Sequence, residues 1–471
     1  MKYLTFFIII MISSIARGES FLPRFIGGLD PGSPTDIRIT GIYYNPAVIG
    51  KLGGTNISLY FSPNFQTVDV SRSTISSITG APDPSGDVHF SSTSYRDTVY
   101  DFFGAITTDF GMDRITLGIA VYSPMQQNIN QVYYPLRYHL IDRNMMNLFI
   151  SSVVSLKMHK KFYFGFGLSY VYSSVYMGVI RDRYLRGTLP EGVEDGYEKG
   201  GIGDEKVEIN TEDNNFGFSA GFLWIPKPWL TVGGSYRSKI RSLEDTSVRT
   251  SGTGKITRYV EGQGFVTLSG DAQMVTSYPD SYNLGVNMRL SRFWYGDFTV
   301  TWTRWSQHSS FRFLLSGNDF TNSNLTNWDL NINSYRGFQD TFTPQFTAYY
   351  RGLSGFNFLA SLKYLPPSVP TSWVNPSAVD NHSAELLLSF TFKLLKNMNL
   401  RFGYAISYML PVEVKNSGFQ PSLARTCLEN HIDVVWSSAC RDTYAGKALP
   451  SAAGNYSKIT HQLGIGIDLK F

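Results

Sequence analysis

Apolar and polar residues alternate along the last fourteen positions of the chain, 458–471. Apolar side chains fill every second position there, with His461 as the exception: Ile459, Leu463, Ile465, Ile467, Leu469 and Phe471. Because successive side chains of a strand point to opposite faces, this pattern predicts an amphipathic strand with one face in an apolar medium. The final aromatic residue is typical of bacterial outer-membrane barrels. A single strand of this kind also fits a soluble sandwich, so the class of fold depends on how often the pattern recurs.

The pattern recurs in seven further segments, at 57–61, 115–121, 162–170, 216–224, 298–302, 356–364 and 398–408. Weaker strands are expected near 98–110, 279–290 and 343–352. Most of the alternating runs are about 9–14 residues long, the length that a tilted strand needs to cross a bilayer. Strands of soluble proteins are shorter, at about 5–6 residues. The lengths therefore favour a transmembrane antiparallel β-barrel, an all-β fold.

Short turns and long polar segments alternate strictly between these strands. Gly111, Lys160, Lys227, Arg292, Ser354 and Asn397 mark the short turns. The long segments span 65–97, 124–144, 176–213, 243–272, 307–341, 365–381 and 410–456. Outer-membrane barrels have short periplasmic turns and long external loops, so seven long loops predict about fourteen strands, with twelve or sixteen as alternatives.

Composition supports the barrel and excludes other classes. Aromatic residues make up 15% of the 471 residues, charged residues only 17%, and there are 43 Gly. After the N-terminal segment no run of 18 apolar residues occurs, which excludes a helical membrane protein. A net charge of +4 is too small to indicate a nucleic-acid partner.

The N-terminal segment predicts export. Residues 1–18 contain a basic Lys2, a short apolar core and a small-residue exit at Gly18, as in a secretory signal peptide. A buried N-terminal helix is the weaker alternative. In an exported protein Cys427 and Cys440, 13 positions apart, are expected to form a local disulfide, with two free thiols as the alternative. The predicted location is the cell outer membrane, with a multi-pass barrel.

Residues 19–54 precede the first strand and are rich in Pro and Gly. That composition allows a disordered periplasmic tail. The run from Tyr43 to Ile49 is apolar enough to need a packing partner, so we expect an N-terminal hatch over 19–54 and the barrel over 55–471.

Several short motifs bear a family resemblance when taken in order. They are Asn45-Pro46-Ala47, the segment 235–239, the segment 302–306, the Pro-rich segment 365–370 and Gly454-Asn455-Tyr456. Together they resemble the FadL/TodX family of outer-membrane transporters of long-chain fatty acids and other hydrophobic compounds. The stretch 25–42 departs from that family because it is rich in Pro and Asp and lacks a run of small residues.

The resemblance implies a fourteen-stranded barrel plugged by a hatch, with capture by the loops and lateral release through an opening at the third strand. It assigns hatch and gating roles to Asn45, Pro46 and Ala47. Gly118 and Pro124 are the residues of the third strand best suited to a bend or gap. The implied partner is a hydrophobic small molecule such as a long-chain fatty acid, and the implied oligomeric state is a monomer.

No catalytic, cofactor or metal site is predicted. The seven His show no metal-ligand spacing, and neither H-E-x-x-H nor G-x-S-x-G occurs, so we expect no enzyme activity. The main alternative function is a general or weakly selective porin, whose lumen would carry more charges than Asp297, Lys363 and Arg401. A role of the loops as an adhesin or phage receptor would be compatible with transport.

The 176–213 loop begins with Arg181, Arg183 and Arg186. These residues fit a carboxylate headgroup, but contact with outer-membrane lipids and lipopolysaccharide is the favoured interpretation.

Overall fold

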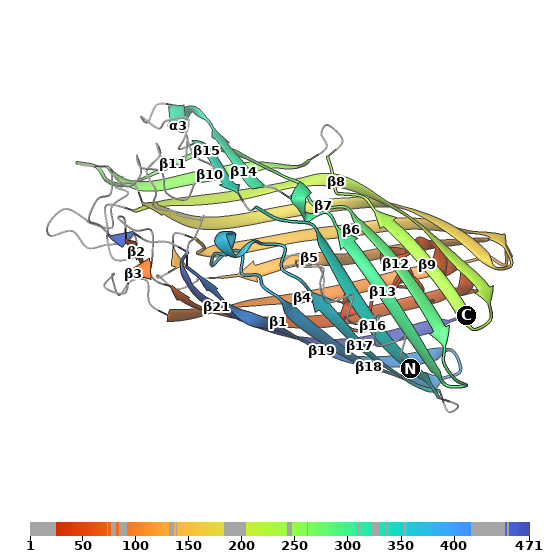
Figure 1. Cartoon of the computed structure of the whole chain (residues 1–471). Coiled ribbons are helices and arrows are strands. Elements are labelled where there is room, and N and C mark those ends of the chain that lie inside the picture. The colour runs from red at the N-terminus through yellow and green to blue at the C-terminus, as the bar shows by residue number, and fades with distance from the viewer. Residues whose placement is uncertain are drawn as a thin grey trace.

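The computed structural model describes residues 25–72, 74–76, 82–83, 92–130, 136–137, 139–182, 204–242, 247–260, 262–308, 310–321, 330–335, 337–352, 355–415, 448–449 and 452–471. Its main feature is a closed antiparallel β-barrel (Figure 1). Fourteen strands of the described ranges form the wall: β1 (Asn56–Arg72), β4 (Ser92–Thr108), β5 (Ile115–Ile129), β6 (Asp142–His159), β7 (Phe162–Asp182), β8 (Asp204–Lys227), β9 (Leu230–Arg237), β12 (Ser281–Arg289), β13 (Trp294–Thr303), β16 (Thr341–Arg351), β17 (Phe356–Leu365), β18 (Ser383–Leu395), β19 (Met398–Val414) and β21 (Gly454–Lys470).

Strand pairing closes this wall. Consecutive wall strands pair antiparallel, and β1 pairs with β21 from Asn56↔Lys470 to Arg72↔Gly454, so the first and last strands complete the cylinder. Closure leaves no open sheet edge in the apolar medium, as a membrane-spanning sheet requires. The fourteen-stranded barrel predicted from the alternation is confirmed.

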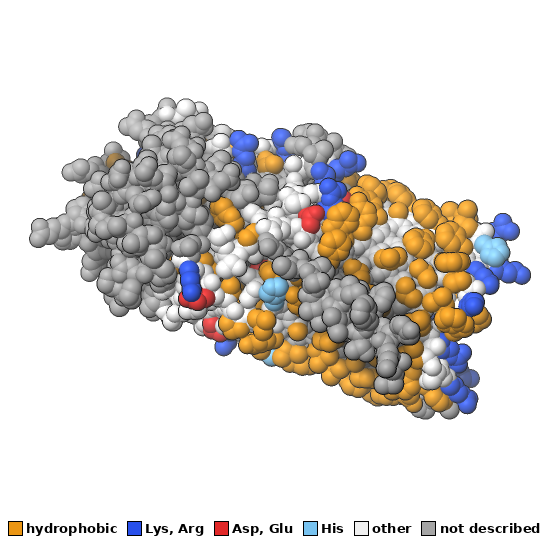
Figure 2. Space-filling view, in the orientation of Figure 1, with side chains coloured by type: hydrophobic (Ala, Val, Ile, Leu, Met, Phe, Trp, Pro, Cys, Tyr) orange, Lys and Arg blue, Asp and Glu red, His pale blue; other side chains and the backbone are white. Residues whose placement is uncertain are grey.

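Alternating residues of each strand face outward and inward as expected. In β21, Leu463 and Ile465 are exposed, whereas Thr460 and Gln462, at the alternate positions, are buried. The outward apolar side chains form a continuous band near the short-turn end of the barrel (Figure 2). Such a band matches the hydrocarbon layer of a membrane. No helix among the described residues is long and apolar enough to span a bilayer.

At the end of the barrel opposite the short turns, the connections differ from the prediction. Two segments predicted as loops, 243–272 and 307–341, contain β10 (Val248–Val260), β11 (Gly264–Thr276), β14 (Ser310–Ser316) and β15 (Asn331–Tyr335). β10 pairs with the outer part of β8, and β11 pairs with β14, so the sheet continues beyond the barrel. β10 and β11 are rich in Thr, Ser and Gly, a weak pattern that looks like a polar loop. β14 does alternate, with Phe311, Phe313 and Leu315 buried, but over only 7 residues.

Smaller elements complete the described structure. They are the 3₁₀-helices η1 (Ile26–Gly28), η2 (Pro46–Lys51), η6 (Trp305–Gln307) and η7 (Thr371–Trp373), the helices α2 (Gly41–Tyr44) and α3 (Asn318–Thr321), and the short strands β2 (Thr74–Ser76), β3 (Pro82–Asp83) and β20 (Ala448–Leu449). Residues 25–54, which hold η1, α2 and η2, lie inside the barrel and are called the hatch below. Their apolar side chains, including Leu29, Ile42 and Ile49, pack against inward-facing wall residues such as Phe103 and Tyr122.

Candidate functional site: the hatch, the cavity and the gap in the wall

Asn45 joins the hatch to the barrel wall. Its Nδ2 donates to the carbonyl oxygens of Pro34, at 2.6 Å, and of Phe222 in β8, at 3.0 Å. Its Oδ1 accepts from the Ala47 amide and so caps η2, in which Pro46 occupies the first turn. The carbonyl of Ala47 accepts from Ser155 Oγ of β6 at 2.9 Å. Asn45 thus stabilises the bend of the hatch before η2 and also links the hatch to the wall.

Two wall glycines make room for this motif. A Cβ at Gly165 of β7 would collide with the backbone of Pro46 and Ala47, and a Cβ at Gly221 of β8 would collide with Asn45 Oδ1. The hatch backbone therefore approaches the wall more closely than any side chain would allow. The motif lies against β6, β7 and β8, while Ile42 of α2 lies against Gly118 of β5.

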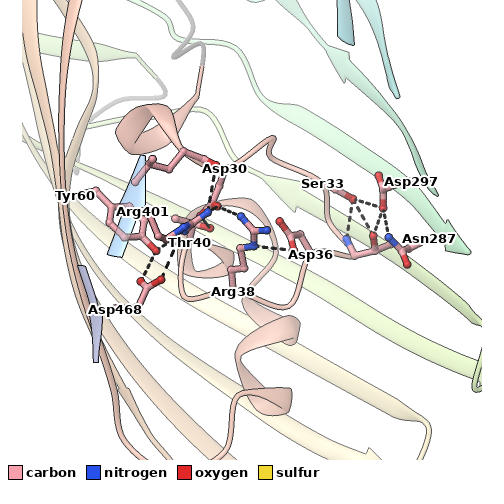
Figure 3. Close-up of polar contacts among 12 residues, drawn as sticks. Asp30, Ser33, Asp36, Arg38, Thr40, Tyr60, Asn287, Asp297, Arg401 and Asp468 are labelled. Carbon is pink, nitrogen blue, oxygen red and sulfur yellow. Dashed lines mark hydrogen bonds and ion pairs between the residues drawn. The ribbon is translucent and has the colours of Figure 1, made fainter. Parts of the chain in front are cut away.

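Charged residues anchor the other side of the hatch. The Asp30 carboxylate forms ion pairs with Arg401 of β19 and with Arg38, and it accepts from Thr40 Oγ1 at 2.7 Å (Figure 3). Arg401 also donates to Tyr60 of β1, at 2.8 Å. Burial alone would raise the pKa of Asp30, but the charges of Arg401 and Arg38 outweigh it and hold that pKa below its usual range.

A second polar anchor lies on β13. The Asp297 carboxylate accepts from Ser33 Oγ at 3.0 Å and from Thr35 Oγ1, both in the hatch (Figure 3). Asn287 and Thr299 of the neighbouring wall positions donate to the same carboxylate. From the sequence we expected Asp297 and Arg401 to be scattered charges in the lumen. In the structure, both side chains form polar contacts with the hatch.

The third strand of the wall, β5, carries the two candidate residues for a lateral opening. The ladder is regular at Gly118, which pairs with Val153 of β6 and Thr107 of β4. A bulge at Ser123-Pro124 shifts the register against β6. Within the described ranges 92–108 and 115–129, the β4–β5 ladder covers only 103–108 against 117–122. Beyond Tyr122 the backbone pairing of the two strands ends, and this separation of the ladders begins at Pro124. The Asn128 amide of β5 still donates across it to Asp97 Oδ1 of β4, at 2.8 Å.

A small cavity of about 30 Å³ lies between the hatch and the strands beside this separation. Its apolar wall includes Ile42 and Tyr43 of the hatch and Tyr122, Phe149 and Phe218 of the barrel. Arg237 of β9 also lines it, with its guanidinium 3.7 Å from the ring centre of Tyr43. Arg237 Nη1 is buried without a hydrogen-bond partner among the described residues, and no described carboxylate forms an ion pair with Arg237. The cavity thus combines apolar walls with one cation.

The segment 366–382, here called the lid, packs against the inner face of the barrel on the loop side. Val369, Val374 and Val379 are buried against inward-facing residues of β1 and β19. Three wall side chains donate to lid carbonyls: Tyr95 of β4 to Pro376, Arg143 of β6 to Ser377, and Lys458 of β21 to Val379, at 2.7–3.0 Å. The lid therefore bridges wall strands that lie on both sides of β5.

Other predicted residues fall elsewhere. Cys427, Cys440, Arg183, Arg186 and the signal segment 1–18 lie outside the described residues. Among the described residues no group of three or more His, Cys, Asp or Glu is arranged to hold a metal ion. Sequence reasoning missed Asp30, Arg38 and Arg237. The only signal for Asp30 and Arg38 was the unusual charge of 25–42, and Arg237 belonged to a family motif without an assigned role.

Solved structures share this fold. A FadL homologue of Pseudomonas aeruginosa matches with a TM-score of 0.69 at 13% identity, over 97% of this chain and 99% of that chain. The monoaromatic hydrocarbon channel CymD matches at 0.63 and 15% identity, over 96% and 99%. The Pseudomonas putida toluene transporter TodX matches at 0.63 and 11% identity, over 97% and 100%. At these identities the likeness shows the fold alone.

Sequence comparison supplies the family. No curated protein matches the chain. A sequence model of the family described as outer membrane protein transport protein (OMPP1/FadL/TodX) matches residues 33–427, which is most of the chain. The chain therefore belongs to the OMPP1/FadL/TodX family of outer-membrane proteins that transport hydrophobic compounds.

Proposed function

We propose that this protein is a passive transporter of long-chain fatty acids or similar hydrophobic molecules, which it captures at the loops and releases sideways into the outer membrane. Movement of the hatch and the lid opens the path, and the separation of β4 from β5 is the exit. The observation that carries the proposal is the position of Tyr122. It is the last ladder residue of β5 and also a wall of the cavity, so the cavity adjoins the separation.

A lateral exit suits an apolar cargo. Each CH₂ group gains about 0.8 kcal/mol on leaving water, so an acyl chain is poorly served by a water-filled pore. A path from an apolar cavity through a gap in the wall keeps the chain out of water. The cavity at 30 Å³ is far smaller than an acyl chain, so the structure represents a closed state in this scheme.

Arg237 supports a carboxylate on the cargo. Arg237 Nη2 donates to Ser281 Oγ at 3.4 Å, whereas Nη1 is a buried donor without a hydrogen-bond partner among the described residues, and a carboxylate ligand would supply that missing bond. The apolar walls around it would take the hydrocarbon part of the same molecule. Neutral hydrocarbons, such as the monoaromatic compounds of CymD or the toluene of TodX, would leave Arg237 Nη1 without this hydrogen bond.

The test is uptake of radiolabelled oleate and of radiolabelled toluene by cells that lack their own transporter, with surface expression confirmed. Deletion of Ser123-Pro124 removes the bulge, and we expect it to abolish uptake of the transported compound. Arg237→Met is expected to reduce oleate uptake at least tenfold while leaving toluene uptake unchanged, because a charge-assisted hydrogen bond contributes about 1.5–3 kcal/mol. Arg312→Met, at an exposed position of β14, is the matched control.

Normal oleate uptake by the deletion variant would reject the lateral exit. Equal oleate uptake by Arg237→Met and the control would reject the carboxylate. An open porin, the alternative function, would instead pass small hydrophilic solutes and show steady conductance in a planar bilayer.

A further inference from the structure

The end of the barrel that carries the short turns is strongly basic. The segments 51–55, 109–114, 157–161, 226–229, 289–293, 351–355, 393–397 and 470–471 contain twelve Lys or Arg and two Asp, a net charge of +10. The whole chain has a net charge of +4, so all its other residues together sum to −6. This concentration of positive charge, here called the basic rim, is not apparent from the net charge of the whole chain.

The basic rim surrounds the barrel. Each of the segments contributes at least one cation, such as Lys51 at the end of the hatch, Lys161 before β7 and Lys396 before β19. Figure 2 shows Lys and Arg side chains beyond the apolar band at this end of the molecule. Only Lys157 forms an ion pair with a carboxylate of these segments, at 2.6 Å from Asp113, among the residues that the structure describes. The rim is therefore a largely uncompensated ring of positive charge.

Aromatic residues place this ring at a membrane boundary. Trp224, Trp229 and Trp294 are exposed at the same end, and Trp side chains favour the interface between hydrocarbon and headgroups. One cation lies beside such a ring: Lys227 Nζ is 5.5 Å from the ring centre of Trp229. The rim thus lies at the level of the lipid phosphates.

We propose that the basic rim binds anionic phospholipid headgroups of the leaflet that faces the short turns. A leaflet surrounds a barrel and can neutralise cations on every side, whereas a soluble partner would contact one part of the ring. Each Lys or Arg near an anionic surface contributes about 1 kcal/mol of attraction, which corresponds to about fivefold in binding. The short turns face the periplasm, so the leaflet is the inner one of the outer membrane.

The experiment uses the protein's own tryptophans in phosphatidylcholine vesicles. Dibrominated lipids quench the fluorescence of nearby Trp side chains, and three of the eight Trp lie at the rim. We compare the quenching by brominated phosphatidylglycerol with that by brominated phosphatidylcholine. The ratio gives the relative binding constant of the two lipids. We expect the unmodified protein to prefer phosphatidylglycerol several-fold. Salt of about 1 M, where the screening length is about 3 Å, should weaken the preference.

Two variants locate the effect. The rim variant carries Lys160→Gln, Lys161→Gln, Arg292→Gln and Lys396→Gln, and we expect its preference to fall at least threefold. The control variant carries Lys255→Gln, Arg312→Gln and Lys415→Gln on exposed positions at the opposite end, and should keep the full preference. If the rim variant does not fold, Lys161→Gln with Lys396→Gln replaces it.

Either of two results would overturn the proposal. One is equal binding of the two lipids by the unmodified protein, including the case in which soluble peptidoglycan fragments bind the rim instead. The other is an unchanged preference in a folded rim variant. Oleate uptake is independent of both results, so a failure here leaves the transport proposal standing.

Discussion

The ion pair between Asp30 and Arg401 is expected to control how often the hatch leaves the wall. Both side chains are almost fully buried, at 1% and 2% exposure. Asp30→Asn keeps the shape of the side chain and removes its charge. The carboxylate that then remains beside Arg401 is Asp468, whose Oδ2 lies 3.9 Å from Arg401 Nε and is partly exposed. The variant therefore leaves a buried cation with a poor partner.

The magnitude follows from the cost of such a cation. Removing one member of a buried ion pair costs about 3–5 kcal/mol, and the lower value applies because Asp468 compensates in part. At 1.36 kcal/mol per factor of ten, about 3 kcal/mol favours the released hatch by about 150-fold. Asn45 and the Asp297 anchor still hold residues 33–47, so release begins at η1.

Single-channel recording in planar bilayers measures this equilibrium directly. We expect Asp30→Asn to spend about a hundredfold more time in conducting states than the unmodified protein. Adding Arg401→Met should restore the closed state, since replacing both members of a buried pair by neutral groups is nearly neutral. Asp36→Asn is the matched control, because Asp36 contacts Arg38 alone among the described ion pairs. A single variant that is as closed as the unmodified protein, or a double variant that leaks like the single one, would refute the reasoning.

Three further predictions follow from the same geometry. Gly165→Ala should increase conductance because its Cβ collides with Pro46 and Ala47, whereas Gly217→Ala, whose Cβ has ordinary contact with Ser238, should not; equal traces from both would contradict the close approach. The lowered pKa of Asp30 means that its ion pair contributes fully above pH 3.8 and is lost only as pH falls through the lower folded value, so the difference in conductance between Asp30→Asn and the unmodified protein should stay constant down to pH 3.8; a difference that shrinks at higher pH would argue against Asp30 as the anchor. Arg143→Leu removes a hydrogen bond from the lid, so in a Cys427→Ser, Cys440→Ser background a Ser377→Cys reporter should react with maleimide about tenfold faster, and an unchanged rate would show that the lid is held elsewhere.

The wall of the barrel was predictable because one physical rule governs all its strands. A residue that faces lipid must be apolar, whereas its neighbours in the strand need not be. The residue types of Leu463 and Gln462 alone therefore indicate which of them faces outward. The outer strands β10 and β14 face water or protein on both sides, and no such rule marks them. The hatch contacts depend on pairs such as Asp30 and Arg401, which are 371 positions apart. Local sequence patterns carry no information about such pairing. An inward-facing charge such as Asp297 would have the same sequence pattern in an open lumen as in a lumen that holds a hatch.

The contacts of η1 have a consequence for biogenesis. Phe25 accepts a hydrogen bond from Gln462 Nε2 of β21, and Asp30 pairs with Arg401 of β19, so the first described residues bind strands that are synthesised near the end of the chain. Contacts of such long sequence separation form late in folding. Docking of the hatch therefore requires a barrel in which β19, β21 and β1 have already met. A barrel closed in another register would lack the surface that these residues contact, so hatch docking depends on correct closure of the barrel.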